Sequence, residues 1–369
     1  MTATKWWRGA VLYQIYPRSF MDANGDGIGD LKGVTSKLDY VKQLGVDGIW
    51  LSPFFKSPMR DFGYDVSDYR AVDPMFGSMQ DFEALLKAAH DRDLKVIIDQ
   101  VWSHTSSDNE WFQQSRQDGQ NEKSDWYVAR FWLQLGVDGF RLDVVNYFVH
   151  DAALRDNPPS GVQAPALPRD MQIHQFNSNQ PETLDFVAKI RERVDGHGDN
   201  MTVGELAPGS YSLMAEYTQG QQRLHTAYSF DFLAAWPGGE KIAAVLNQWR
   251  EGPDDGWPSW AFSNHDVRRV ATRWGEALGC PAPRAAPLFM ALLMSLRGTI
   301  FLYQGEELGL PEADVPFEKL QDPWGINGWP ATKGRDGCRT PMPWKDETLA
   351  GFSKSKDTWL PVDARQRLL

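Results

Sequence analysis

Eight short apolar runs, separated by stretches with helical periodicity, constrain the fold of this 369-residue chain more than any other feature. Each run is a strand candidate, and an intervening stretch such as 31–44 repeats its apolar residues at three- and four-residue steps, as an amphipathic helix does. The runs occupy residues 11–16, 48–52, 95–99, 137–143, 201–205, 225–230, 258–266 and 299–305. Eight strand–helix units in series predict an α/β fold, a parallel (β/α)8 TIM barrel.

Polar side chains follow five of the eight strand candidates, at the point where each candidate ends. They are Asp99, His104, Arg141, Asp143, Glu205, His265, Asp266, Gln304 and Glu306. The carboxyl ends of barrel strands lie on one face, and active sites of such barrels are built there. The sequence therefore predicts that acids, histidines and an arginine converge on one rim.

Two carboxylates at the ends of neighbouring strands are candidates for paired acid chemistry. Arg141 and Asp143 lie two residues apart on one strand face, so the cation is expected to lower the pKa of Asp143 and keep it ionised, as a nucleophile requires. Glu205 ends an apolar strand, where poor solvation is expected to raise its pKa, as a general acid requires. Retaining glycosidases hold two carboxyls about 5–5.5 Å apart, close to the spacing of about 4.8 Å between adjacent strands. Taken singly, Asp143 could form a structural salt bridge and Glu205 could be an ordinary strand-end acid; the pair favours a glycosidase.

A third acid and two histidines are predicted on the same rim. Asp266 can hold sugar hydroxyls and favour an oxocarbenium-like transition state, and the adjacent His265 can donate to the same hydroxyls. His104 follows the third strand candidate. With no cysteine or third close ligand, the two histidines suit hydrogen-bond donors better than a zinc site.

The segment 22-DANGDGIGD-30 is a candidate metal loop. It places the oxygen ligands Asp22, Asn24, Asp26 and Asp30 among glycines, which suits Ca²⁺ or Mg²⁺. It is not an EF-hand, because Gly33 occupies the twelfth position and a strand precedes the loop. The alternative is a turn rich in glycine and aspartate without a metal.

Charge and composition narrow the classes of partner. The net charge of −11 argues against nucleic acids and against anionic membrane surfaces. Two isolated cysteines, Cys280 and Cys338, make neither a disulfide framework nor a zinc site. No apolar window is long enough for a membrane span, and the first residues do not form a signal peptide. We therefore expect a soluble, cytoplasmic protein whose 16 tryptophans serve core packing or sugar contacts.

Four segments together, DQVWSH, GFRLDVVN, VGEL and FSNHD, resemble the conserved regions of the α-amylase family, glycoside hydrolase family 13. The runs 61-DFGYDVSDY-69, DANGDGIGD and 334-GRDGCRTPMPW-344 are similar to those of the bacterial α-glucosidase and oligo-1,6-glucosidase branch. The closest resemblance is to maltose-active α-glucosidases that also transfer glucosyl groups, and it extends over nearly the whole chain.

This resemblance implies a role for each matching residue. Asp143 resembles the nucleophile, Glu205 the acid/base and Asp266 the transition-state stabiliser. Asp61 and Arg339 resemble the pair that grips the outer hydroxyls of the terminal glucose. Tyr64 would stack under that ring, and His104, Arg141 and His265 would donate to it. The Asp22 loop resembles a structural Ca²⁺ or Mg²⁺ site to which the carbonyl of Ile28 contributes.

The chain departs from the family pattern in two places. Members carry a small domain inserted after the third strand, and here only residues 105–130 stand in that position. We therefore expect residues 1–104 to form the first half of the barrel, 105–130 a remnant of the inserted domain, and 131–369 the remainder of the barrel. We also expect the C-terminal β-sandwich of the family to be missing from this chain. A barrel incomplete at its third and eighth helices, with one wall of the pocket missing, is predicted.

The predicted function is a retaining α-glucosidase that cuts terminal α-linked glucose from maltose-like sugars, with transglucosylation. An inactive truncated scaffold and a glucosyltransferase or sucrose isomerase remain alternatives, whereas the lack of a metal-ligand cluster on the rim disfavours a metal-dependent hydrolase. Val144 after the nucleophile points to α-1,6 activity, and the segment 151–161 resembles a loop of disaccharide-specific enzymes. Linkage preference and oligomeric state stay open.

Overall fold

The fold is taken from a computed structural model of the chain. It describes residues 5–117, 126–163, 168–207, 211–234, 236, 238–251 and 256–366.

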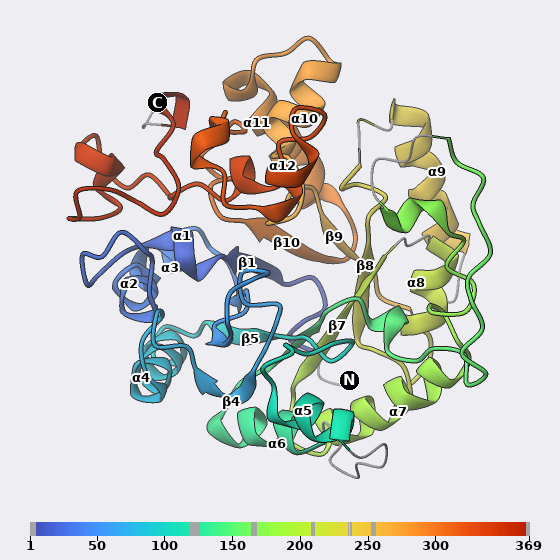
Figure 1. Cartoon of the computed structure of the whole chain (residues 1–369). Coiled ribbons are helices and arrows are strands. Elements are labelled where there is room, and N and C mark those ends of the chain that lie inside the picture. The colour runs from blue at the N-terminus through green and yellow to red at the C-terminus, as the bar shows by residue number, and fades with distance from the viewer. Residues whose placement is uncertain are drawn as a thin grey trace.

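The centre of the molecule is one parallel sheet that curls into a barrel (Figure 1). Its strands are β1 (Val11–Ile15), β2 (Gly48–Leu51), β5 (Lys95–Gln100), β6 (Gly139–Leu142), β7 (Met201–Leu206), β8 (Thr226–Ser229), β9 (Ser259–Ala261) and β10 (Thr299–Tyr303). The sheet order is β8-β7-β6-β5-β2-β1-β10-β9, and a parallel bridge between Ala227 and Pro258 joins its two edges. All eight predicted strands are confirmed, and the barrel is nearly closed.

Helices surround the barrel (Figure 1). They are α1 (Pro17–Phe20), α2 (Leu31–Ser36), α3 (Leu38–Gln43), α4 (Met79–His90), α5 (Glu110–Gln117), α6 (Trp126–Leu135), α7 (Glu182–Asp195), α8 (Tyr211–Thr218), α9 (Gly238–Glu251), α10 (Val270–Ala277), α11 (Ala282–Ser295) and α12 (Pro323–Gly328). The predicted helical stretch 31–44 is divided into α2 and α3 at Lys37. Among the described residues, no single helix is long and apolar enough to cross a membrane; only the sharply bent pair α10 and α11 passes by length and composition.

Large side chains fill the interior of the barrel. Trp50, Tyr228 and Phe301 pack together there, with ring centroids 5.7–6.4 Å apart. A second, larger core lies between the sheet and the surrounding helices. Because the interior is packed, the functional groups are confined to the rim where the strands end.

A helix of ten residues stands at the third helix position of the barrel, where an incomplete helix was predicted. Helix α6 occupies it, and Trp132 of α6 is fully buried against Phe54, Phe55 and Phe82. The indole N–H of Trp132 also donates to the carbonyl of Tyr69 at 2.8 Å. These contacts anchor α6 although the segment before it is short.

The eighth helix position follows the prediction more closely. After β10, the described residues to Gln366 form α12, of six residues, and 3-10 turns. These turns are Phe317–Lys319, Asp336–Cys338, Thr348–Gly351 and Ala364–Gln366. No long helix follows β10 in this part of the chain.

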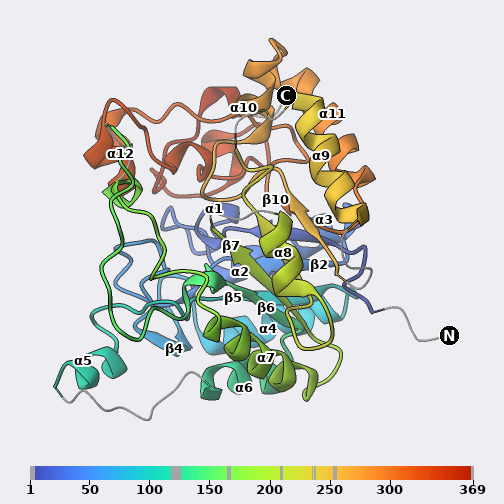
Figure 2. The ribbon, with the colours of Figure 1, turned by 90° about the vertical axis from the view of Figure 1, so that its right-hand side faces the viewer.

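A short hairpin carries two of the predicted site residues to the rim. Strands β3 (Phe55–Lys56) and β4 (Asp68–Val72) pair antiparallel, and the connection between them holds Asp61 and Tyr64. Gly63 in this connection has φ +104°, a conformation that glycine adopts readily. Figure 2 shows β4, α5 and α12 on one side of the barrel and the N-terminus on the other.

Candidate active site

Arg141, on β6, is the centre of a buried ionic cluster on the rim. Its guanidinium is fully buried and donates to Asp99 and Asp143 at 2.7 Å each. It also lies 2.5 Å from Glu205, on β7. The hydroxyl of Tyr228, on β8, accepts from Nε and Nη2 of Arg141 at 3.2 and 3.0 Å. One cation therefore holds carboxylates that arrive from three neighbouring strands.

The two acids of the predicted pair meet at this cluster. A side-chain hydrogen bond joins Asp143 and Glu205, and both carboxylates contact Arg141. The backbone N–H of Val144 donates to Oε2 of Glu205 at 3.2 Å. Val144 has φ +33°, an unfavourable conformation for a β-branched residue, and this backbone strain lies directly after Asp143.

The pKa values of the pair are separated. Burial raises the pKa of Glu205 to about 8, although the charge of Arg141 opposes the rise. Burial also raises the pKa of Asp143 to about 6 against the opposing charge of Arg141. The expected low pKa of Asp143 was therefore wrong, because the sequence shows the nearby cation but not the loss of water. At neutral pH Asp143 is still mostly ionised and Glu205 mostly protonated, which assigns a different chemistry to each.

Asp266 is held as an ionised carboxylate beside this pair. Its Oδ1 accepts from Arg339 at 2.7 Å and from Arg335 at 3.3 Å. Although burial opposes it, contacts with His265, Arg339 and Arg335 hold the pKa of Asp266 well below its usual value. An ionised carboxylate in this position suits the stabilisation of positive charge on a sugar ring.

Tyr64 and His265 form a parallel stack at the floor of the site. Their ring centroids are 5.3 Å apart and their planes differ by 3°. The hydroxyl of Tyr64 contacts Nε2 of His265 at 2.5 Å and donates to Asp99 at 3.1 Å. Gln14 contacts Nδ1 of the same histidine at 2.7 Å. Burial lowers the pKa of His265 to about 3, so the imidazole is neutral at physiological pH.

Asp61 joins the cluster through Arg335, which lies 3.1 Å from its Oδ1. The shared grip on a terminal glucose that the resemblance implies for Asp61 and Arg339 stays a prediction. Arg335 also binds the buried Asp322 at 2.9 Å, and Arg339 instead binds Asp266 and the carbonyl of His265. Asp61 and Arg339 are thus linked in one cluster through Arg335 and Asp266.

His104 is the one predicted sugar-binding residue that lies outside the cluster among the residues described. Its side chain is exposed, and its Nδ1 contacts the hydroxyl of Ser103 at 2.9 Å. Its carbonyl accepts from Tyr69 at 3.0 Å, which fixes the backbone below it. The ring of His104 is therefore accessible to solvent.

Sequence reasoning missed three residues of the site: Arg335, Tyr228 and Gln14. Arg335 stands four residues before Arg339 in the same quoted motif, so that motif could have indicated both cations. Tyr228 is the register partner of Glu205 on the next strand, which the alternation of side chains in 225–230 could have indicated. Gln14, inside β1, gave no signal beyond being a polar residue in an apolar strand.

The predicted metal loop is closed by its own hydrogen bonds. Asp22 accepts from the N–H groups of Gly25 and Gly27 at 2.6 and 2.8 Å. Asp26 accepts from Ile28 at 2.8 Å, and Asp30 caps α2 by accepting from Gly33. Among the described residues, no group of three or more acidic, histidine or cysteine side chains is arranged to hold a metal ion. As they stand, these side chains do not form a metal cage, and the metal stays a prediction.

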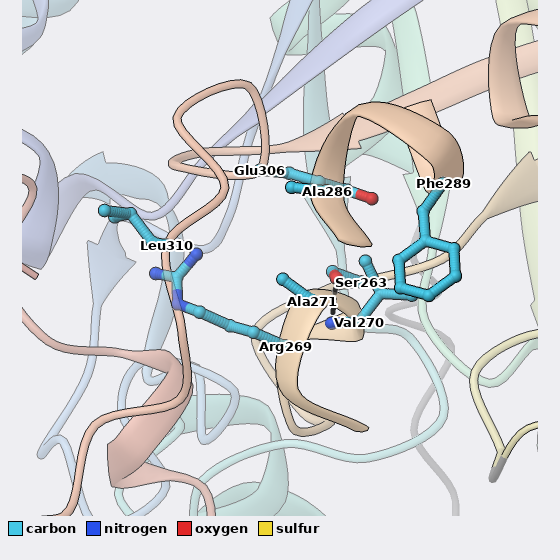
Figure 3. Close-up of a pocket in the computed structure, with 8 residues that line it drawn as sticks. All are labelled: Ser263, Arg269, Val270, Ala271, Ala286, Phe289, Glu306 and Leu310. Carbon is cyan, nitrogen blue, oxygen red and sulfur yellow. Dashed lines mark hydrogen bonds between the residues drawn. The ribbon is translucent and has the colours of Figure 1, made fainter. Parts of the chain in front are cut away.

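A small cavity between α10, α11 and the segment after β10 is not a sugar site (Figure 3). It has room for about one water molecule and is lined by Ser263, Arg269, Val270, Ala271, Ala286, Phe289, Glu306 and Leu310. Burial raises the pKa of Glu306 to about 8, so this acid, which was predicted at the rim, is mostly protonated at neutral pH. None of the lining residues is an acid of the Asp143 cluster.

The fold and the site define a class of enzyme. A (β/α)8 barrel holds two adjoining carboxyl groups with separated pKa values and a third, ionised acid, which is the constellation of a retaining glycoside hydrolase. The chain belongs to the α-amylase family: the family model described as the alpha amylase catalytic domain matches residues 14–130 and 128–368. The predicted family is thus confirmed.

Curated relatives and solved structures agree with this family. The probable alpha-glucosidase of Rhizobium meliloti (strain 1021) is 44% identical, and the match covers 97% of this chain and 77% of the relative. The oligo-1,6-glucosidase of Heyndrickxia coagulans is 32% identical, with 98% and 80% covered. The crystal structure of the alpha-glucosyl transfer enzyme XgtA is similar with a TM-score of 0.92 and 47% identity, covering 99% of this chain and 80% of that one.

The alignments also indicate where relatives are longer. The match to the Rhizobium meliloti protein extends over 427 positions, more than the 369 residues of this chain, so that relative has internal residues without a counterpart here. The two matched stretches of the family model meet at residues 128–130, at the beginning of α6. The division at 104 and 130 into barrel and remnant stays a prediction.

Proposed function

We propose that this protein is a retaining α-glucosidase that releases terminal glucose from maltose-like di- and oligosaccharides. The main support is the pair Asp143 and Glu205. The two side chains are hydrogen bonded to each other, both contact Arg141, and their pKa values are separated. The names of the relatives, α-glucosidase and oligo-1,6-glucosidase, support the substrate class.

The chemistry follows from the protonation states. Ionised Asp143 attacks the anomeric carbon while protonated Glu205 gives its proton to the departing glycosidic oxygen, and a covalent glucosyl–Asp143 ester forms. Glu205, now ionised, takes a proton from water, which attacks the anomeric carbon and frees Asp143. Asp266 stabilises the positive charge that develops on the ring in both steps.

The remaining residues are proposed to hold the terminal glucose. Nη1 of Arg339 is buried without a hydrogen-bond partner among the described atoms, so it can donate to a sugar hydroxyl. Tyr64 presents an aromatic ring for stacking, and the neutral His265 stacked against it holds the Tyr64 hydroxyl in place. Asp61 and His104 are exposed enough to contact the sugar from the open side.

Glucosyl transfer is the second candidate, and a specific observation favours it. The XgtA structure, which is named for glucosyl transfer, is 47% identical to this chain. Transfer needs no new residue, because a sugar hydroxyl in place of water attacks the same covalent ester. Product analysis at high maltose concentration separates transfer products from free glucose.

The direct test is glucose release from maltose and isomaltose by the purified chain, assayed from pH 5 to pH 10. We expect turnover with a bell-shaped profile, because Asp143 must be ionised, which requires a pH above about 6, and Glu205 must be protonated, which requires a pH below about 8. Activity should therefore rise through pH 6, peak near pH 7 and fall through pH 8.

Two results contradict this proposal. A chain that melts cooperatively but releases no glucose from any α-glucoside would favour the inactive scaffold. Activity that stays constant from pH 7 to pH 10 would remove Glu205 as the proton donor, because its carboxyl must lose its proton in that interval.

Two further properties are proposed from the sequence. The loop 22–30 is proposed to bind Ca²⁺ or Mg²⁺ for stability and not for catalysis, with Asp22, Asn24, Asp26, Ile28 and Asp30 as ligands. We expect a higher melting temperature in calcium than in a chelator, and we expect Asp26→Ala to remove this difference. An identical melting temperature of the wild type in both solutions would contradict the proposal.

A cytoplasmic location is the second proposal, and fractionation of the source cells tests it.

A further inference from the structure

Tyr228 contacts both members of the Arg141–Glu205 pair from the neighbouring strand. Glu205 on β7 and Tyr228 on β8 are partners in the parallel register, which places their side chains next to each other inside the rim. Both are buried, with 3% and 1% of their surface exposed. The ring of Tyr228 packs on Trp50 and Phe301, so its position is fixed by the barrel interior.

The hydrogen bonds of the Tyr228 hydroxyl give its proton one direction. A phenol oxygen has two lone pairs and one proton. Arg141 donates to that oxygen from Nε at 3.2 Å and from Nη2 at 3.0 Å, which uses both lone pairs. The hydroxyl proton then points to Oε1 of Glu205, which lies 3.3 Å away. Tyr228 therefore donates to Glu205 and cannot at the same time accept from it.

We propose that Tyr228 is a positioning residue for Glu205, whose hydroxyl favours the ionised carboxylate left after Glu205 has protonated the leaving group. The inference rests on the proposed acid/base role of Glu205. The physical reason is that a donor stabilises the charged form of a carboxylate more than the neutral form. Tyr228 thus lowers the free energy of the state in which the glycosidic bond has broken.

The other groups that face Glu205 stay in place when only this hydroxyl is removed. Arg141 contacts Oε2 at 2.5 Å and the Val144 N–H donates to it at 3.2 Å. Four charged groups surround Glu205. Arg141 and Asp143 lie on and directly after β6, Asp266 follows β9, and Asp99 lies on β5. Tyr228→Phe therefore removes the hydrogen bond to Oε1 of Glu205 together with the two that the hydroxyl accepts from Arg141, while the ring still fills the barrel.

Tyr13→Phe is a matched control. Tyr13 lies on β1, is fully buried and donates to a partly buried glutamate, Glu307, at 2.6 Å. Both variants thus remove a barrel tyrosine hydroxyl from a glutamate Oε1. Only one of the two glutamates is Glu205, so a general loss of stability would appear in both variants and a specific effect in one.

The experiment titrates Glu205 in the full chain by infrared spectroscopy. The protonated carboxyl band is followed from pH 5 to pH 10 as the difference between each protein and its Glu205→Gln counterpart, and kcat and KM for maltose are measured in parallel. For Tyr228→Phe we expect the Glu205 midpoint to move up by about 0.5–1 pH unit, with the basic limb of kcat following it. We also expect kcat near pH 7 to fall about 3- to 10-fold while KM changes less than about 2-fold. Tyr13→Phe should leave the midpoint unchanged.

A second substitution keeps the test informative if the phenylalanine variant folds poorly. With 3-fluorotyrosine placed at position 228, the more acidic hydroxyl is a stronger donor, and the Glu205 midpoint should move down. An unmoved midpoint in both variants, or an equal shift in Tyr13→Phe, overturns the inference. Because the infrared titration needs no turnover, an inactive wild-type chain would contradict the proposed function while the role of Tyr228 is still decided.

Discussion

Replacing Asp143 with asparagine is expected to lower kcat for maltose hydrolysis by at least about 10⁴-fold. Asparagine keeps the shape of the side chain and an oxygen for the 2.7 Å bond from Arg141, but it cannot form the glucosyl ester. Substrate binding should change little, so the loss should fall on kcat. The measurement is glucose release at saturating maltose.

The variant should also stay folded, which separates lost chemistry from lost structure. Burial raises the pKa of Asp143 to about 6, so ionising it in the native protein costs free energy that asparagine does not. At pH 8 the melting temperature of Asp143→Asn should therefore equal or exceed that of the wild type.

Asp39→Asn is the matched control for this experiment. Asp39 pairs with Arg92 at 2.6 Å on the surface of α3, so the same chemical change is made beside an arginine far from the rim. Its activity should equal that of the wild type. Should Asp143→Asn keep more than about a tenth of the wild-type rate, the nucleophile has been assigned to the wrong residue.

The barrel could be predicted from the sequence because its strands are buried on both faces. Such strands are continuous apolar runs, and all eight predicted runs are strands in the structure. The division of α2 from α3 at Lys37 could not be predicted, since the apolar period continues unbroken across that residue. The anchoring of α6 by Trp132 was likewise hidden, because its aromatic partners come from a segment about 50–80 residues earlier in the chain.

At the site, most of the residues could be predicted, but several of their contacts and pKa values could not. Strand ends indicated Asp143, Glu205 and Asp266, whereas the partner of Asp61 depends on a contact with Arg335 across 274 residues. The pKa of Asp143 shows the same limit. A neighbouring arginine is visible in the sequence, but the burial that outweighs its charge is a property of the assembled rim.

Removing the charge of Arg141 is expected to have the largest effect on stability. Arg141→Met keeps an unbranched side chain but leaves Asp99, Asp143 and Glu205 buried without their cation. Breaking a buried ion pair in this way costs about 3–5 kcal/mol, so urea unfolding at pH 8 should show a loss of at least that size. Glucose release should disappear as well.

The sign of the pH dependence identifies the cause of this loss. Burial already raises the folded-state pKa of Asp99 and Asp143 to about 6 and that of Glu205 to about 8, above their unfolded values near 4. Groups raised in this way contribute stability that is complete below the unfolded pKa and is lost as pH rises through the folded one. Without Arg141 the folded values rise further, so the deficit of the variant should be smaller at pH 5 than at pH 8.

A second-site test decides whether the buried charges are responsible. Adding Asp99→Asn and Glu205→Gln to Arg141→Met removes two of the unpaired charges, so most of the lost free energy of unfolding at pH 8 should return. If the deficit is instead the same at pH 5 and pH 8, and the added amides restore nothing, then packing of the Arg141 side chain on Trp50 stabilises the rim and its charge does not. In that case the paired carboxyls would ionise independently of this cation, and burial alone would set their separated pKa values.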